Sequence, residues 1–312
     1  MHSRRDVLRA LSYLSAATCA NSIVACGAQN AQLTFADVTR VWWNPDPAIA
    51  GANNFYDAHH IGIKRSEYAT GRECLDAVIA GNADLGVAAG SPLLFAALAG
   101  RTSVVKVVAC ISQSNDLIHI ISHREQGASL PTGPVGYVKN TASEYALRRV
   151  FNGMPAAQDA VNVAPNQLAP LFANGALQSF ICWEPYPAIA LKTAQDQGIP
   201  AFVWSQSGLY NLSFFVFARR DRMADQATSI NSFLDALQDA ATWLAENRQR
   251  SQEAISRNMG IEQSLFERYW TSVDFQVRRS PDAIASLLAV EASTAFETGV
   301  TSTHVDLAAL AK

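Results

Sequence analysis

The sequence predicts an α/β protein with two similar lobes, on three observations. The chain has 312 residues, which is more than one hydrophobic core usually supports. A short apolar strand that leads through small and hydroxyl-bearing residues into a helix occurs twice. A helix that ends in glycine just before a strand also occurs twice, as expected of two related α/β units.

Composition limits the class of function. With 49% hydrophobic and 16% charged residues, the chain is globular and well cored. Its net charge of −3 and the lack of a long basic run argue against nucleic acid as a partner.

Residues 1–26 are expected to be an export signal and are set apart from the fold. Residues 3–9 resemble a twin-arginine signal, and the apolar segment that follows is too short and too polar to span a membrane. Residues 23–27 resemble the lipobox of bacterial lipoproteins, in which Cys26 would be lipidated and become the mature N-terminus. The alternative is an ordinary cleaved signal peptide with a chance cysteine. Both interpretations place the protein in the periplasm or cell envelope, and the first attaches it to a membrane through acyl chains alone.

The first lobe is predicted to begin with a strand at 38–43, closed by a turn at 44–47 that contains two prolines. The small-residue-rich stretch 48–60 has room for a short helix. A clearer helix at 72–80 keeps apolar residues on one face, and a strand at 85–89 follows its glycine stop.

Two further strands are expected at 104–111 and 117–122. The polar residues 113–116 lie between them, and such a turn faces either a cleft or solvent. Asn115 of this turn is a candidate ligand contact.

The second lobe centres on a strand at 135–138 that leads into a helix. Asn140, Thr141, Ala142 and Ser143 open this helix, whose buried face is predicted at positions 146, 147, 150 and 151. Asn152 and Gly153 end it. Helix starts leave free backbone N–H groups, so hydroxyls and an amide around them make an anion site. The alternative is that Thr141 and Ser143 only cap the helix.

A second copy of this arrangement lies in the first lobe. Gly90, Ser91 and Pro92 follow a strand directly and open a helix at 93–98, with Pro92 expected at its first position. Opposing helix starts at Ser91 and at Thr141 could both donate to one anionic head group.

The remaining elements follow the same α/β pattern. Strands are expected at 161–163, 180–183, 199–204 and 212–218, a helix at 168–172, and helices from 225 onward.

Taken together, these motifs resemble the substrate-binding proteins of bacterial ABC importers of the nitrate, sulfonate and taurine class, with their thiamine-pyrimidine relatives. The resemblance covers roughly residues 38–219. It rests on Gly81 to Asp84 before a strand, Gly90-Ser91-Pro92, the Asn140 to Ser143 helix start, and Trp183-Glu184-Pro185 after a strand. The chain departs from the family at Gln178, where the family usually has Asp, and at Asn54-Phe55-Tyr56, where it has Gly and two aromatics.

The resemblance implies a two-lobe periplasmic-binding-protein-like fold of the class II type, with the ligand cleft between the lobes. The first lobe would comprise 33–123, the second 124–216, and residues 217–312 would return to the first lobe and add helices. A monomer is expected, working with an ABC permease and ATPase. The ligand would be a small anionic organic solute, such as a sulfonate, taurine or nitrate, trapped by lobe closure. A thiamine-precursor pyrimidine, another aromatic molecule, or an exported ligand sensor are the alternatives.

The resemblance also suggests cleft residues. Trp42, Trp43 and Asn44 stand where the family's pocket wall lies, and at most one of the two tryptophans should face the cleft. Trp183 and Glu184 resemble the family's cleft-edge pair, and Glu184 either binds an amine or caps its helix. Tyr210, near the return to the first lobe, is a weaker candidate.

Catalysis, metals and cofactors are not expected. His59 and His60 are adjacent, which does not make a metal pair, and no paired-cysteine motif accompanies them. Enzymes of this fold in thiamine-pyrimidine synthesis carry a cysteine-rich motif that the chain lacks. Cys74, Cys110 and Cys182 lie in apolar segments and are expected to be buried free thiols.

Overall fold

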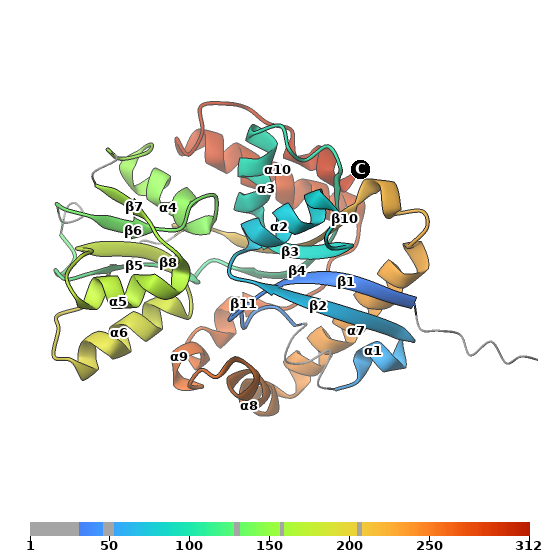
Figure 1. Cartoon of the computed structure of the whole chain (residues 1–312), viewed down its shortest axis with the longest axis horizontal. Coiled ribbons are helices and arrows are strands. Elements are labelled where there is room, and N and C mark those ends of the chain that lie inside the picture. Colours follow the sequence, from blue (N-terminus) through green and yellow to red (C-terminus); the bar gives the residue numbers. More distant parts are fainter. Residues whose placement is uncertain (1–30, 46–52, 128–131, 157–158, 205–207) are drawn as a thin grey trace, which may run out of the picture. The chain divides into compact units, whose positions relative to one another are not determined.

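The computed structural model describes residues 31–45, 53–127, 132–156, 159–204 and 208–312, which form two β-sheets (Figure 1). The first sheet has the strand order β11-β4-β10-β3-β1-β2 and the second the order β7-β6-β8-β5-β9. The strands of the first sheet are β1 (Ala31–Val38), β2 (Ile61–Tyr68), β3 (Leu85–Ala89), β4 (Val105–Ser114), β10 (Leu212–Arg219) and β11 (Val273–Asp274). Those of the second are β5 (Ile118–Ser122), β6 (Val135–Tyr137), β7 (Ala160–Asn162), β8 (Ser179–Trp183) and β9 (Phe202–Trp204).

The chain passes between the sheets twice. It leaves the first sheet after β4 and enters the second at β5, and it returns between β9 and β10. The strand that enters each sheet is antiparallel to its neighbours: β5 to β8 and β9, and β10 to β3 and β4. The pairs β1–β3, β6–β7 and β6–β8 are parallel, and the short β11 is antiparallel to β4. Both changes of sheet precede the lobe boundaries expected at 123/124 and 216/217, which stay predictions.

Helices cover both faces of each sheet (Figure 1). The α-helices are α1 (Phe55–Ala58), α2 (Gly71–Ala80), α3 (Gly90–Leu98), α4 (Ala142–Phe151), α5 (Leu168–Ala173), α6 (Tyr186–Asp196), α7 (Ala227–Glu246), α8 (Arg248–Met259), α9 (Ser264–Glu267) and α10 (Pro281–Glu297). Short 3₁₀ helices are η2 (Pro165–Gln167), η3 (Arg220–Arg222), η4 (Trp270–Ser272) and η5 (Leu307–Ala311). In the first sheet α2, α3 and α10 lie on one face, and α1 and α7 on the other. In the second, α4 lies opposite α5 and α6.

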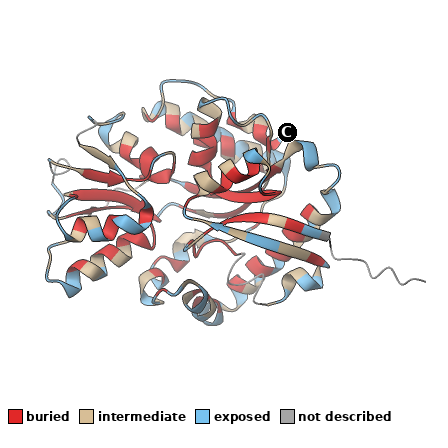
Figure 2. Cartoon of the chain, viewed as in Figure 1, coloured by how far each residue is buried: buried red, intermediate tan, exposed pale blue. Residues whose placement is uncertain are grey.

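Burial follows the sheets (Figure 2). Every residue of β3, β5 and β8 is buried, because helices cover both faces of these strands. β2, at the edge of the first sheet, is mostly exposed or half-buried. Its charged and polar residues weaken the apolar signal, which is why sequence patterning did not identify it as a strand. The helix that the capping alternative for Glu184 implies is α6.

Several predicted elements are confirmed. The helix predicted at 72–80 is α2, whose capping box joins Thr70 to Glu73, and Gly81 ends it in the left-handed region at φ 80°. The strand predicted at 85–89 is β3. The strand and helix of the second lobe are β6 and α4, with Thr141 as N-cap and Asn152 as left-handed C-cap. Cys74, Cys110 and Cys182 are buried and free, as predicted.

Three expectations about these elements are wrong in detail. β1 ends at Val38, so the strand expected at 38–43 is a turn, in which Arg40 has a φ of 58°. α3 begins at Gly90, which makes Pro92 its third residue. Phe151, expected on the buried face of α4, is 38% exposed.

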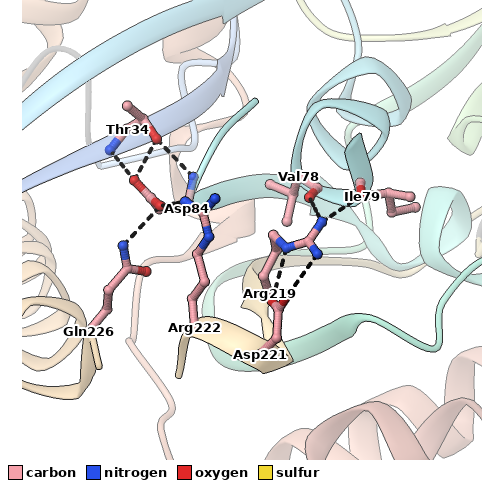
Figure 3. Close-up of polar contacts among 8 residues, drawn as sticks. All are labelled: Thr34, Val78, Ile79, Asp84, Arg219, Asp221, Arg222 and Gln226. Carbon is pink, nitrogen blue, oxygen red and sulfur yellow. Dashed lines mark hydrogen bonds and ion pairs between the residues drawn. The ribbon is translucent and has the colours of Figure 1, made fainter. Parts of the chain in front are cut away.

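Asp84 joins distant parts of the first sheet (Figure 3). Its Oδ2 accepts from the backbone N and hydroxyl of Thr34 on β1, at 2.8 and 2.5 Å. Its Oδ1 accepts from Arg222 at 2.7 Å and Gln226 at 2.9 Å. Burial raises the pKa of Asp84, but the hydrogen bonds from Gln226, Thr34 and Arg222 together hold it below its ordinary value. In the same view Arg219 donates to the Ile79 carbonyl at the end of α2, at 2.8 Å, and pairs with Asp221.

Gln178 holds the equivalent position in the second lobe. Its backbone N donates to the Pro134 carbonyl at 2.9 Å, as the Asp84 N donates to Thr34, also at 2.9 Å. The Gln178 side chain reaches only the Gly175 carbonyl, at 3.5 Å. The departure from the family's Asp therefore changes local side-chain contacts and leaves the backbone pairing in place.

Candidate functional site

A small cavity lies where strands of both sheets end and helices begin. We call it the aromatic cavity. Its walls come from the end of β1, the β3–α3 and β6–α4 junctions, the end of β8 and the start of β10. Its volume is ≈ 30 Å³, which is about the room of one or two water molecules. Its lining residues are Val38, Val41, Trp43, Gly71, Ala89, Pro92, Thr141, Ala142, Trp183, Leu212 and Phe214.

Two tryptophans, Trp43 and Trp183, line this cavity. Trp43 packs edge-on against Phe214 and Trp183 edge-on against Tyr186, with ring centroids 6.3 and 5.9 Å apart. Both indole Nε1 atoms are buried, and neither has a hydrogen-bond partner among the described residues. A buried N–H without an acceptor is costly, so two unsatisfied donors belong to side chains that line this cavity.

The tryptophans at positions 42 and 43 take different roles. Trp42 stacks on Trp270, with centroids 5.8 Å apart and planes at 15°, and it also packs on Phe266. It therefore belongs to the core beside η4, while Trp43 lines the aromatic cavity. Asn44 donates to the Asp37 carboxylate at 2.7 Å. Burial raises the pKa of Asp37 to about 7, and the nearby Arg65 opposes this shift.

The hydroxyls at the start of α4 are committed to the protein itself. The Thr141 hydroxyl donates to the Val138 carbonyl at 2.7 Å and accepts from the Ser143 N at 3.2 Å. The Ser143 hydroxyl accepts from the Val138 N at 2.9 Å and donates to the Ile181 carbonyl on β8. The capping alternative is thus confirmed for Thr141, whereas the Ser143 hydroxyl joins the residue after β6 to β8 and does not cap α4. What the α4 start presents to the cavity is the wall formed by Thr141 and Ala142.

Replacing Ser143 with alanine should therefore destabilise the fold. It leaves the buried Val138 N and Ile181 carbonyl without this partner, at an expected cost of about 1–3 kcal/mol. Urea unfolding followed by circular dichroism measures the effect. Ser286→Ala is the matched control, because the hydroxyl of Ser286 bonds only within exposed α10. Equal stability of the Ser143 variant and the wild type would contradict the structural role.

The start of α3 is also occupied. The Ser91 N donates to the Tyr210 hydroxyl at 3.0 Å, and this hydroxyl donates in turn to the Glu291 carboxylate at 3.1 Å. The Ser91 hydroxyl is buried without a partner among the described residues. Gly90 and Ser91 are not among the residues that line the cavity, although Ala89 and Pro92 on either side of them in the sequence are.

Glu184 follows β8 and is fully buried. One carboxylate oxygen accepts from the Ala188 N at 3.3 Å, which supports the helix-capping interpretation for α6. The other lies 3.4 Å from the His119 Nε2, and neither atom has a hydrogen-bond partner. Burial raises the pKa of Glu184 to about 8, against hydrogen bonding from Ala188 and Tyr269 and the charge of Arg268. Burial also lowers the pKa of His119, so both groups tend toward their neutral forms.

A second, larger cavity of ≈ 510 Å³ lies beside the two connections between the sheets. We call it the crossover cavity. Asn115 and Tyr210, two of the candidates from the sequence, are at its wall and not in the aromatic cavity. Its lining residues are Gln113, Ser114, Asn115, Tyr145, Arg149, Tyr210, Asn211, Leu212, Ser213, Ser272, Leu287, Val290, Glu291 and Thr294.

The structure thus brings together four of the candidate residues, Trp43, Thr141, Ala142 and Trp183, around one cavity. Asn140, in the left-handed region at φ 58°, donates from its N to the Glu144 carboxylate at 2.7 Å. The apolar wall residues Val38, Val41, Leu212 and Phe214 were not singled out from the sequence, because apolar residues at strand ends carry no signal of their own.

Within the described ranges, no group of three or more His, Cys, Asp or Glu side chains is placed to hold a metal ion. His59 contacts Asp239 at 2.8 Å. None of the helices described has both the length and the apolarity of a membrane span. Cys26 and the rest of residues 1–26 lie outside the described residues.

The two sheets with crossing connections and a cavity at their facing ends define an α/β periplasmic-binding-protein fold of class II. The sequence matches the NMT1-like family over residues 28–257, and the chain belongs to that family. No curated protein sequence matches it.

Solved structures of binding proteins share the fold. The chain is similar to the alkanesulfonate-binding protein SsuA from Xanthomonas axonopodis pv. citri bound to MOPS, with a TM-score of 0.74 and 19% identity over 91% of this chain and 98% of that one. It is also similar to the periplasmic aliphatic sulphonate binding protein SsuA from Escherichia coli, with a TM-score of 0.68 and 18% identity over 89% and 96%. The periplasmic nitrate-binding protein NrtA from Synechocystis PCC 6803 gives a TM-score of 0.66 and 14% identity over 90% and 84%.

Proposed function

We propose that the protein is the extracytoplasmic solute-binding component of an ABC importer and captures a small anionic organic solute in the aromatic cavity. The observation that carries this is the pair of buried, unpartnered indole N–H groups of Trp43 and Trp183 on the walls of that cavity. Trp43 lies in the turn after β1 of the first sheet and Trp183 ends β8 of the second, so a ligand that accepts from both favours the approach of the lobes.

The lining explains the class of ligand. No charged side chain lines the aromatic cavity, so an anionic head group would be held by N–H donors and by the positive ends of α3 and α4. The aromatic and aliphatic walls suit an organic tail. The cavity is far smaller than an organic sulfonate, so binding requires its walls to separate and then enclose the ligand.

The cellular setting belongs to the same proposal. Binding proteins of this fold, such as the two SsuA proteins and NrtA, are described as periplasmic or as sulfonate- and nitrate-binding. We place this chain in the cell envelope as a monomer, exported by the twin-arginine route and attached to a membrane through lipid on Cys26. Its partners would be an ABC permease and ATPase, and no cofactor or catalytic step is involved.

A thermal-shift screen of the purified protein tests the ligand class. The panel holds taurine, short and aromatic sulfonates, nitrate, bicarbonate and hydroxymethyl-pyrimidines. A ligand at a hundred times its Kd should stabilise the fold by roughly 2.7 kcal/mol. Stabilisation by sulfonates supports the proposal. Stabilisation by pyrimidines alone would favour the aromatic-ligand alternative, and no response to any of them would contradict the assigned ligand class.

Trp183→Phe is the sharpest variant for this site. It keeps a ring on the wall and removes the Nε1 donor, so sulfonate binding should weaken by about tenfold or more, as expected for a lost hydrogen bond to a charged group. Isothermal titration calorimetry gives the two Kd values. Trp42→Phe is the matched control, since the Trp42 Nε1 is also buried and unpartnered but Trp42 does not line the cavity. Equal loss of binding in both variants would argue against the assigned donor.

A further inference from the structure

We propose that the crossover cavity is a second ligand site, and that it takes a small zwitterion whose ammonium group pairs with Glu291 and whose acidic group pairs with Arg149. The site is distinct from the aromatic cavity, and it stands whether or not the solute proposed above is the right one. Its volume of ≈ 510 Å³ falls in the range of ordinary small-molecule pockets.

Glu291 places a buried carboxyl group at the wall of the crossover cavity. It lies on α10, lines the cavity and is only 7% exposed. Its single hydrogen-bond donor among the described residues is the Tyr210 hydroxyl, although a carboxylate has about four acceptor positions. On its other side the carboxylate packs against Gly90, where an added Cβ would stand 2.8 Å from it. A buried carboxylate with one donor and no cation is poorly satisfied, and an ammonium group would supply both charge and donors.

The desolvation of Glu291 has a chemical consequence. Burial raises its pKa to about 8, against the hydrogen bond from Tyr210. At pH 7 the carboxyl group is therefore mainly protonated. An entering ammonium group favours the ionised form, so the proton on Glu291 passes to the buffer as the ion pair forms.

Arg149 places a guanidinium group at the same cavity. It lies on α4, lines the same cavity and is half-buried. Within the described part of the chain its guanidinium forms no ion pair and no side-chain hydrogen bond, whereas its neighbour Arg148 pairs with Glu144. A planar guanidinium without a partner on a cavity wall is suited to a carboxylate or sulfonate.

Tyr145, Arg149 and Glu291 all line the crossover cavity. Burial raises the pKa of the Tyr145 hydroxyl, Glu291 raises it further, and Arg149 lowers it. Glu291 on α10 and Arg149 on α4 therefore both influence the Tyr145 hydroxyl, but they do not form an ion pair with each other. A guanidinium and a carboxyl group that ionises when an ammonium group approaches share one cavity without contact, and they match a molecule that carries both charges, separated by a short chain.

The crossover cavity is connected to the start of α3 and to the aromatic cavity. Tyr210 connects Glu291 to the Ser91 N at the start of α3, and Leu212 lines both cavities. Because α4 packs with the second sheet and α10 with the first, a zwitterion that bridges them would stabilise the arrangement of lobes seen in the structure.

Calorimetric titration of the full-length protein with glycine, β-alanine and γ-aminobutyrate tests the proposal, since these zwitterions differ in the separation of their charges. At least one should bind at pH 7. Propionate and propylamine carry one charge each, so their affinity should be lower by a factor of about ten or more. The apparent enthalpy should vary with the ionisation enthalpy of the buffer, because Glu291 releases its proton.

Two variants locate the binding. Glu291→Gln and Arg149→Gln should each weaken it by about tenfold or more, and Glu291→Gln should also abolish the buffer dependence. Arg149 is half-buried and its side chain makes no hydrogen bond or ion pair among the described residues, so its variant should fold even if the Glu291 variant does not. Arg257→Gln, an exposed arginine on α8 away from the cavity, is the charge-matched control and should bind as the wild type does. If none of the three zwitterions binds, or if binding persists in Arg149→Gln, the proposal is wrong.

Discussion

Replacing Asp84 with alanine is expected to lower the free energy of unfolding by about 2–4 kcal/mol. The substitution removes the acceptor for two donors of Thr34 on β1 and for Arg222 and Gln226 in the segment that follows β10 (Figure 3). Thr34 and Asp84 are 50 positions apart and Arg222 is a further 138 positions on, so a single carboxylate joins three distant segments of the first lobe. Urea unfolding followed by tryptophan fluorescence measures the loss.

Gln178→Ala is the matched control for Asp84. Gln178 occupies the same place before its strand, with the same backbone bond, but its side chain makes only one long contact. Its replacement should change stability by about 0.5 kcal/mol or less. Comparable losses at the two positions would show that the backbone pairing, and not the carboxylate network, determines stability there.

Replacing Glu184 with glutamine is expected to make the protein more stable at high pH and less sensitive to pH. The pKa of Glu184 is raised from 4.5 to about 8 in the folded protein, mainly by burial. The folded state therefore holds a proton that the unfolded state releases, so stability is highest below about 4.5 and falls as the pH rises toward about 8. Above that pH the loss is complete. A glutamine is neutral at every pH. The unfolding free energy of the variant minus that of the wild type should therefore be about 2–4 kcal/mol larger at pH 9 than at pH 5.

The measurement is the difference in unfolding free energy between variant and wild type across pH 5 to 9. Taking this difference cancels the contributions of Asp37 and Glu291, whose pKa values are also raised by burial. The groups that face Glu184 are His119 on β5, Asp116 in the first connection, and Arg268 and Tyr269 after α9. Glu246→Gln, an exposed position at the end of α7, should leave the profile unchanged. A Glu184→Gln profile parallel to that of the wild type would mean that Glu184 is ionised in the fold.

Local sequence patterns were enough to predict the elements that are specified by neighbouring residues. The helix α2, the strand β3, and the β6–α4 junction could be predicted because each is specified by apolar spacing and by capping residues a few positions away. The repetition of these units predicted the two lobes. The edge strand β2 could not be identified in this way, because its side chains are largely solvated and carry no apolar pattern.

Which side chains come into contact depends on the packing of the whole chain and could not be predicted from local patterns. Trp42 and Trp43 are adjacent in the sequence, yet one stacks on Trp270 and the other lines the aromatic cavity. The hydroxyls of Thr141 and Ser143 were predicted as possible ligand contacts, but in the structure they donate to the carbonyls of Val138 and Ile181. Glu291 and Arg149 come together from helices 142 positions apart, and no local pattern marks either of them. The reason is physical: spacing and caps act within a few residues, whereas burial, hydrogen-bond satisfaction and charge pairing depend on the packing of the whole chain.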